Sequence, residues 1–173
     1  MMSKFNSQAL SQLGFTFIEA ILYVSIITIM LSALVPFVWN ILFVKAKSSI
    51  QHEVSSNARF ISERVKSEIR NSTGINSVTS TSISLVKATS SLNPTVITWS
   101  VPNITIKQGS GPTTNLNSAS VHVTNFLFTN NSSVDLLTQN IGFTFSIEQS
   151  GSGPRAEYKA SETYQSAVEL RGF

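Results

Sequence analysis

A long apolar run near the N-terminus constrains this chain more than any other feature of its sequence. The run extends from Phe15 to Val44, is 30 residues long, and carries a single charged side chain, Glu19. A helix needs about 20 apolar residues to cross a bilayer, so this run is long enough to span a membrane and to project beyond it. A carboxylate at membrane depth is costly unless a cation pairs with it. Glu19 is therefore the first candidate for a functional group.

The composition of the remaining chain excludes several classes of function. The full length of 173 residues leaves room for one compact domain after the apolar run. Charged residues make up 12% of the chain and the formal net charge is +3, so the basic pI reflects a small imbalance among few charges. This balance does not predict binding to nucleic acid. The absence of cysteine excludes disulfide frameworks, zinc–thiolate sites and thiol nucleophiles.

Helical periodicity continues beyond the apolar run. From Ile50 to Ile69 the apolar residues recur at steps of three and four, which predicts an amphipathic helix with one apolar stripe. We expect the charged residues to form a solvated face, on which pairs four residues apart contribute only about 0.3–0.5 kcal/mol each. The residues Asn71 to Gly74 are typical of a helix end closed by glycine. The charged residues are Arg59, Glu63, Arg64, Lys66 and Glu68, with Arg59–Glu63 and Arg64–Glu68 able to pair.

The sequence after Gly74 predicts β-structure. It is rich in Ser, Thr and Asn, but its apolar residues alternate in short blocks, which favours a folded sheet over disorder. Pro102-Asn103 is typical of a tight turn, so the blocks on either side of it should form a hairpin. The segments 109–112 and 150–154 are predicted loops. The predicted strands are Ser82–Lys87, Thr95–Val101, Ile104–Gln108, Val121–Thr129, Ile141–Gln149 and Tyr164–Leu170.

These patterns predict an α+β fold in which one long helix packs on an antiparallel sheet. The apolar stripe of the second half of the helix and the apolar face of the sheet each need a partner, and packing one on the other is the simplest solution. We expect residues 15–44 to form a transmembrane segment, residues 45–73 an amphipathic continuation of the same helix, and residues 74–173 a β-rich globular domain.

The block Gly14-Phe15-Thr16-Phe17-Ile18-Glu19, followed by the apolar helix, resembles the N-terminal signal of type IV prepilins and of type II secretion pseudopilins. In that family a membrane peptidase cuts after the glycine and methylates the new N-terminal residue. The resemblance implies a leader at residues 1–14, cleavage between Gly14 and Phe15, and N-methylation of Phe15. It also places Glu19 at the family's acidic position and Pro36 where many pilins have a proline that bends the helix.

The residues themselves give a physical reason for such an arrangement. Cleavage would create an α-amino group at Phe15, and the Glu19 carboxylate lies four residues further along the same helix. If subunits stack with an axial offset, the carboxylate of one can pair with the amine of its neighbour, so neither charge is left alone in an apolar filament core. A head-to-tail contact that does not close into a ring generates a helical filament. Separately, Pro36 predicts a bend or local unwinding near Phe37.

The sequence also departs from the family pattern. The leader ends in Ser11-Gln12-Leu13, where many members have a basic residue, and Phe17 occupies a position at which leucine is common. Lys45 and Lys47 lie at the far end of the span, so positive charge does not favour a cytoplasmic N-terminus, and that orientation is implied by the resemblance alone. The absence of cysteine excludes the C-terminal disulfide loop of many major pilins. The order of elements is similar to that of minor subunits, including J-type pseudopilins and W-type minor pilins.

Other candidate sites are poorly supported. His52 and His122 are the only histidines and Asp135 is the only aspartate, so neither a histidine-rich metal site nor a calcium-loop spacing is present. An aromatic platform for single-stranded nucleic acid would need exposed rings and nearby basic residues, and Lys87 and Lys107 are too few. We expect the rings to form a core instead. They are Trp99, Phe126, Phe128, Phe143 and Phe145.

We therefore expect a structural subunit, a minor pilin or pseudopilin, without enzymatic activity and without a cofactor. Its expected partners are the prepilin peptidase, other pilin or pseudopilin subunits and the cytoplasmic membrane, with no direct partner among nucleic acids. It would insert in the membrane as a single span with its N-terminus inside and then enter an extracytoplasmic filament. The alternative is an uncleaved, membrane-anchored binding protein whose β-domain recognises an extracytoplasmic ligand. An anchored enzyme is a third class, for which no partnered catalytic group is visible.

Overall fold

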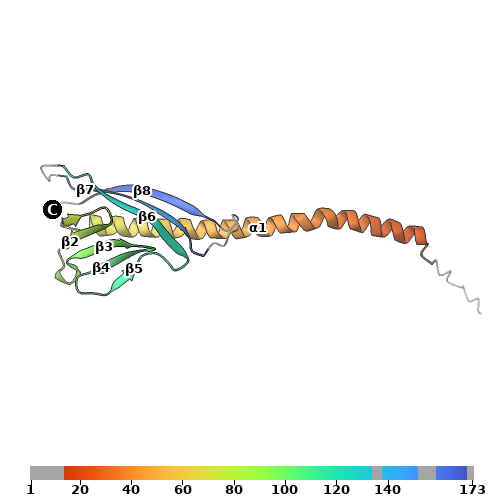
Figure 1. Ribbon diagram of the computed structural model, residues 1–173, viewed down its shortest axis with the longest axis horizontal. Coiled ribbons are helices and arrows are strands. Elements are labelled where there is room, and N and C mark those ends of the chain that lie inside the picture. The colour runs from red at the N-terminus through yellow and green to blue at the C-terminus, as the bar shows by residue number, and fades with distance from the viewer. Residues whose placement is uncertain (1–13, 134–137, 152–158, 171–173) are drawn as a thin grey trace, which may run out of the picture. The chain divides into compact units, whose positions relative to one another are not determined.

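The computed structural model describes residues 14–133, 138–151 and 159–170 (Figure 1). The chain divides after Leu42 into two compact units, residues 1–42 and 43–173. Most of the expected leader, part of the loop expected at 150–154, and Asp135 lie outside the described residues.

A single helix, α1, extends from Phe17 to Arg70 and contains 54 residues, which confirms the long helix predicted from the sequence. Its C-terminal end differs from the prediction, because Gly74 does not close it in a left-handed conformation and is instead the first residue of a strand. The last turn is closed by the backbone N–H of Asn71, which donates to Ser67, and by that of Ser72, which donates to Ile69. The carbonyls of Ser67 and Ile69 therefore find partners without a glycine.

Within the described residues, eight strands follow the helix and form two antiparallel sheets, where the sequence predicted one sheet of six strands (Figure 1). The α+β class is confirmed. β1 and β5 were not predicted, because β1 contains only two apolar residues and β5 contains none. The first sheet contains β1 (Gly74–Val78), β2 (Ser82–Val86), β3 (Thr95–Ser100), β4 (Asn103–Gln108) and β5 (Thr113–Asn115), and the second contains β6 (Val121–Asn130), β7 (Asn140–Gln149) and β8 (Ser161–Glu169).

The predicted hairpin is present, although its turn lies one residue earlier than expected. β3 and β4 pair in an antiparallel register that joins Ser100 to Asn103, so Val101 and Pro102 form the turn. Asn103 is therefore a strand residue. Its side chain accepts a hydrogen bond from Asn117, which explains why this asparagine is held at the strand end rather than in the turn.

The core of the globular unit lies between the second half of α1 and the two sheets (Figure 1). The apolar stripe of the helix is buried as predicted, with Ile61 and Val65 completely inaccessible. The rings of Phe126, Phe143 and Phe145 are also buried, with centroids 5.7–6.3 Å apart. These rings are core residues, as the sequence predicted, and are not an exposed stacking platform.

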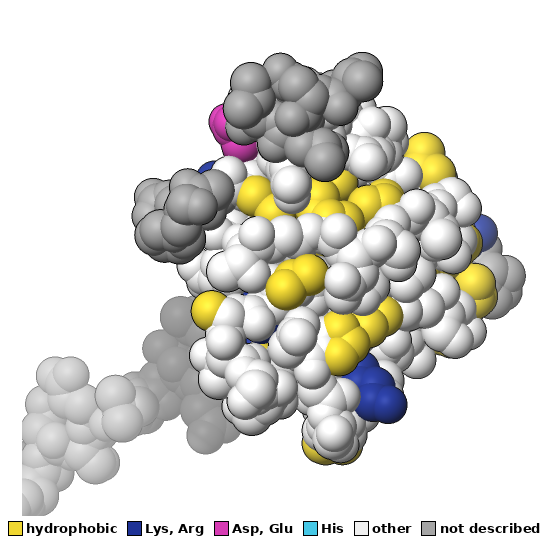
Figure 2. All heavy atoms as spheres, turned by 90° about the vertical axis from the view of Figure 1, so that its left-hand side faces the viewer, with side chains coloured by type: hydrophobic (Ala, Val, Ile, Leu, Met, Phe, Trp, Pro, Cys, Tyr) yellow, Lys and Arg dark blue, Asp and Glu magenta, His cyan; other side chains and the backbone are white. Residues whose placement is uncertain are grey.

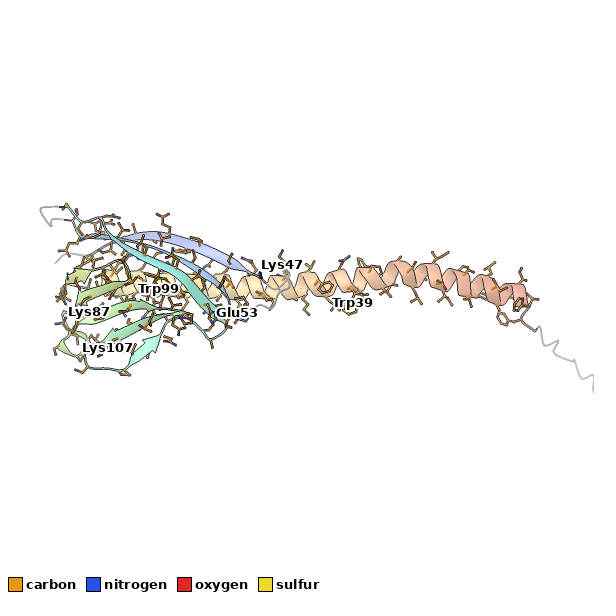
Figure 3. All side chains as sticks on the ribbon, in the orientation of Figure 1. Trp39, Lys47, Glu53, Lys87, Trp99 and Lys107 are labelled. Atoms are coloured by element: carbon orange, nitrogen blue, oxygen red, sulfur yellow. The ribbon has the colours of Figure 1, made fainter. Side chains whose placement is uncertain are left out.

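Two polar side chains join the sheets. Asn117 is buried, accepts a hydrogen bond from the backbone N–H of Ile104 at 3.0 Å, and donates to the carbonyl of Val121 at 2.9 Å. The indole N–H of Trp99 donates to the carbonyl of Val123 at 3.2 Å (Figure 3). Because a buried polar group is costly when unpaired, these bonds fix the position of β6 beside the first sheet.

The turn that follows β4 depends on a glycine. Gly109 has a φ of +51°, and a Cβ at this position would lie 2.2 Å from the carbonyl oxygen of Ser91. We expect Gly109→Ala to lower the free energy of unfolding by about 2–3 kcal/mol, since a left-handed conformation costs about 1–2 kcal/mol and the clash adds at least about 1 kcal/mol. Urea denaturation of the protein in detergent measures this loss.

Gly151 supplies the matched control for that substitution. Its φ is +69°, but a Cβ there would meet nothing within 4 Å. We expect Gly151→Ala to cost only the conformational part, about 1 kcal/mol. Equal losses in the two variants would contradict the close approach of the segment around Ser91 to the turn at Gly109.

Candidate functional site

The described part of the chain begins at Gly14, the residue after which cleavage is expected from the sequence. Gly14 and Phe15 lie before the helix, and Phe15 is 74% exposed. The Thr16 hydroxyl accepts a hydrogen bond from the backbone N–H of Glu19 at 3.4 Å, and the Thr16 carbonyl accepts one from Ala20 at 3.2 Å. Thr16 is therefore the N-cap of α1, and the Thr-x-x-Glu spacing matches a capping box, a signal that was readable in the sequence.

Glu19 lies in the first turn of α1 and is exposed. It forms no ion pair with any residue in the described part of the chain. A carboxylate at this position is stabilised by the partial positive charge of the helix N-terminus, typically by 0.3–1 kcal/mol at an exposed site. The interaction with the helix dipole gives Glu19 a role within its own helix. Because the dipole is not a formal countercharge, the carboxylate is still available to pair with a cation from outside the helix.

The first unit presents apolar side chains outward on all sides of the helix. All residues from Phe17 to Val44 are exposed, and the ring of Phe15 contacts that of Tyr23 at a centroid distance of 5.9 Å. The hydroxyls of Ser25, Thr28 and Ser32 donate to carbonyls of their own helix, at 2.7–2.8 Å. These three polar groups therefore need no water, which suits a helix in an apolar medium.

By length and composition, α1 is able to cross a membrane. Its best 18-residue window has a mean hydropathy of 2.4, and none of that window is buried within the protein. A signal sequence near an N-terminus passes the same test of length and composition. Pro36 lies inside the continuous helix. The helix is continuous through Pro36, so no local unwinding interrupts it at this position. A bend of the helix axis at Pro36 stays a prediction.

A buried ion cluster lies at the other end of α1, within the globular unit. The Glu68 carboxylate accepts bonds from Lys87 Nζ at 2.8 Å, from Arg64 Nη2 at 2.9 Å and from Gln108 Nε2 at 3.1 Å. Lys87 also donates to the backbone carbonyl of Glu68 at 2.7 Å, close to the C-terminus of the helix (Figure 3). Both Glu68 and Lys87 are 7% exposed. This ion cluster connects α1 to the end of β2 and to β4.

The ion cluster corrects one expectation from the sequence. The Arg64–Glu68 pair is confirmed, but Glu68 is buried rather than part of a solvated face. A signal for this was available, because Glu68 lies three residues after Val65 and seven after Ile61, on the apolar stripe itself. Lys87 had no comparable signal, since only the tertiary fold brings β2 to the helix end.

Other charges on α1 form a smaller network. Glu63 pairs with Lys66 at 3.1 Å, whereas Arg59 forms no ion pair within the described residues. Lys66 also lies 5.4 Å from the ring centroid of Tyr164, on β8. Burial lowers the pKa of Lys66, but the hydrogen bonds to Glu63 and Tyr164 more than offset this, so the pKa is raised above its usual value of 10.5. The ammonium therefore stays charged across the physiological range.

The two histidines do not form a metal site. His52 is exposed on α1, while His122 on β6 lies 2.8 Å from the Ser150 hydroxyl. Within the residues that the structure describes, no group of three His, Asp or Glu side chains is arranged to hold a metal ion.

Comparison with known proteins leaves the family of this chain open. No family model matches the sequence, and neither the curated proteins nor the solved structures include one that is similar to it.

Proposed function

We propose that this protein is a structural subunit of a type IV pilus-like filament, similar to minor pilins or pseudopilins, and that it is processed between Gly14 and Phe15. The observation that carries the proposal is the exposed Glu19 carboxylate in the first turn of an apolar helix, directly after the Gly14-to-Glu19 block that resembles a prepilin signal. The α+β fold with one long N-terminal helix is compatible with a pilin-like architecture and supports the same proposal.

Processing would change the electrostatics of the helix start. Removal of residues 1–14 would place an ammonium group at Phe15, where the helix dipole disfavours a cation. Glu19 lies one turn further on and offsets that charge within an isolated subunit. In a filament the carboxylate would pair with the amine of a neighbour, and this pair would fix the axial register between subunits more than it would add stability. The apolar helix would form the filament core and the β-sheets would face outward.

The N-terminal peptide of the mature protein tests this proposal. We expect mass spectrometry of the native membrane fraction to find a peptide that begins at Phe15, heavier by one methyl group on its N-terminus. Substitution Gly14→Leu should block processing and retain residues 1–14, because the cleavage site would no longer contain the glycine. A mature protein that retains Met1 or Met2 would contradict the processing step and would favour an uncleaved anchor with a binding domain.

A further inference from the structure

A pocket opens beside the ion cluster on the surface of the globular unit. It has a volume of about 360 Å³ and lies between α1, η1 (Ser90–Leu92) and the segment from β4 to β5. Gly109 brings two of these walls together, because only glycine allows the close approach of the turn to Ser91. The lining residues used below are Arg64, Gln108, Ser91, Thr114, Leu92 and Pro112.

The charges of the ion cluster beside this pocket do not balance. Arg64 and Lys87 contribute two positive charges, and Glu68 is the one carboxylate that pairs with either of them within the described residues. Both Glu68 oxygens are occupied, Oε1 by Arg64 and Gln108 and Oε2 by Lys87. The ion cluster therefore carries one uncompensated positive charge, in a region where Lys87 and Glu68 are shielded from water.

Arg64 is the member of the ion cluster that can reach a ligand. Its side chain is 43% exposed and lines the pocket, and it contacts Glu68 through one terminal nitrogen. A guanidinium has five N–H donors in a planar fork, so donors remain for a second carboxylate. Figure 2 shows one face of the globular unit, on which uncharged side chains and backbone cover most of the surface.

The rest of the lining indicates what kind of anion fits. Leu92 and Pro112 form an apolar part of the wall, while Ser91 and Thr114 are polar residues of the lining. An inorganic anion has no apolar surface that could pack against the apolar part of the wall. An acidic side chain carries its carboxylate on an aliphatic stem, and this stem can pack there. We propose that this pocket binds an acidic side chain of a partner protein, with Arg64 as the residue that pairs with the carboxylate. This inference does not depend on the proposed filament role.

The test uses the full chain in a non-ionic detergent and three probes, namely N-acetylglutamate α-amide, its neutral glutamine counterpart and inorganic phosphate. We expect the glutamate probe to shift the NMR signals of the Gln108 side-chain amide and the Gly111 backbone amide in a saturable way. The glutamine probe should leave both signals unchanged because it lacks the charge.

Three variants assign the effect to the pocket. Arg64→Gln should weaken binding of the glutamate probe by about tenfold or more, the change expected when a charge-assisted contact is lost. Ser91→Glu keeps Arg64 and places a carboxylate in the pocket, so it should prevent binding by occupying the site. Arg59→Gln removes an exposed arginine of the same helix that does not line the pocket, and it should bind like the unchanged protein.

Several outcomes would overturn the inference. These are equal shifts with the glutamine probe, unchanged affinity in Arg64→Gln or Ser91→Glu, or no saturable shift up to about 100 mM, where binding would be too weak to matter. Tighter binding of phosphate than of the glutamate probe would show a simple anion site and would contradict recognition of a side chain.

Discussion

Replacing Glu19 by alanine is expected to leave membrane insertion unchanged and to reduce incorporation of the protein into filaments by about a hundredfold. Insertion depends on the apolar run, which the substitution makes slightly more apolar. Incorporation of the Glu19→Ala variant into a filament would leave the Phe15 amine of a neighbouring subunit unpaired in an apolar core. Breaking a buried ion pair in this way costs about 3–5 kcal/mol. The lower value already corresponds to about two orders of magnitude in an equilibrium constant. Quantitative blotting of membrane and sheared filament fractions measures both quantities.

Two further variants separate charge from shape. Glu19→Gln keeps the size of the side chain and removes its charge, so it should assemble as poorly as Glu19→Ala. Glu63→Gln removes an exposed carboxylate of the same helix outside the apolar run, and it should assemble normally. Filaments with a normal content of the Glu19→Gln protein would show that the carboxylate does not set the register, even if processing at Phe15 is confirmed.

Replacing Lys87 by methionine is expected to lower the free energy of unfolding by about 3 kcal/mol, because Lys87 donates two charge-assisted hydrogen bonds to Glu68 and each such bond contributes about 1.5–3 kcal/mol. Arg64 and Gln108 would still contact one oxygen, but the other oxygen and the Glu68 backbone carbonyl would lose their donor. For a unit of this size the loss corresponds to a fall in Tm of about 10 °C or more. Thermal unfolding followed by circular dichroism measures it.

A double variant and a surface control make this prediction specific. Lys107→Met alters an exposed lysine in the same sheet and should change the stability by no more than about 0.5 kcal/mol (Figure 3). The double variant Glu68→Leu with Lys87→Met removes both buried charges together, so it should recover most of the stability lost in the single variant. Additive losses in the double variant would contradict a direct coupling between Glu68 and Lys87.

Features that depend on interactions between residues close in the sequence were mostly predicted correctly, whereas features that depend on distant partners were missed or displaced. The helix was predictable because periodicity and propensity are local, and the core rings of Phe126, Phe143 and Phe145 were predictable because alternate strand residues share a face. β1 and β5 were missed because an edge strand pairs through its backbone and needs few apolar residues. The turn of the β3–β4 hairpin was displaced by one residue because Asn103 is held by Asn117, a partner fourteen residues away.

For the candidate sites, the sequence by itself determined the N-terminal features, since Thr16, Glu19 and the apolar run act within a few turns of one helix. Only the tertiary structure decided the ion cluster and the pocket beside it. Glu68, Lys87 and Gln108 come from three separate parts of the chain, and their contacts with one another do not follow from any spacing, although the place of Glu68 on the apolar stripe indicated its burial. The sequence determines which residues are charged, but the energy of interaction between two charges depends on the local dielectric environment, and this environment is produced by packing.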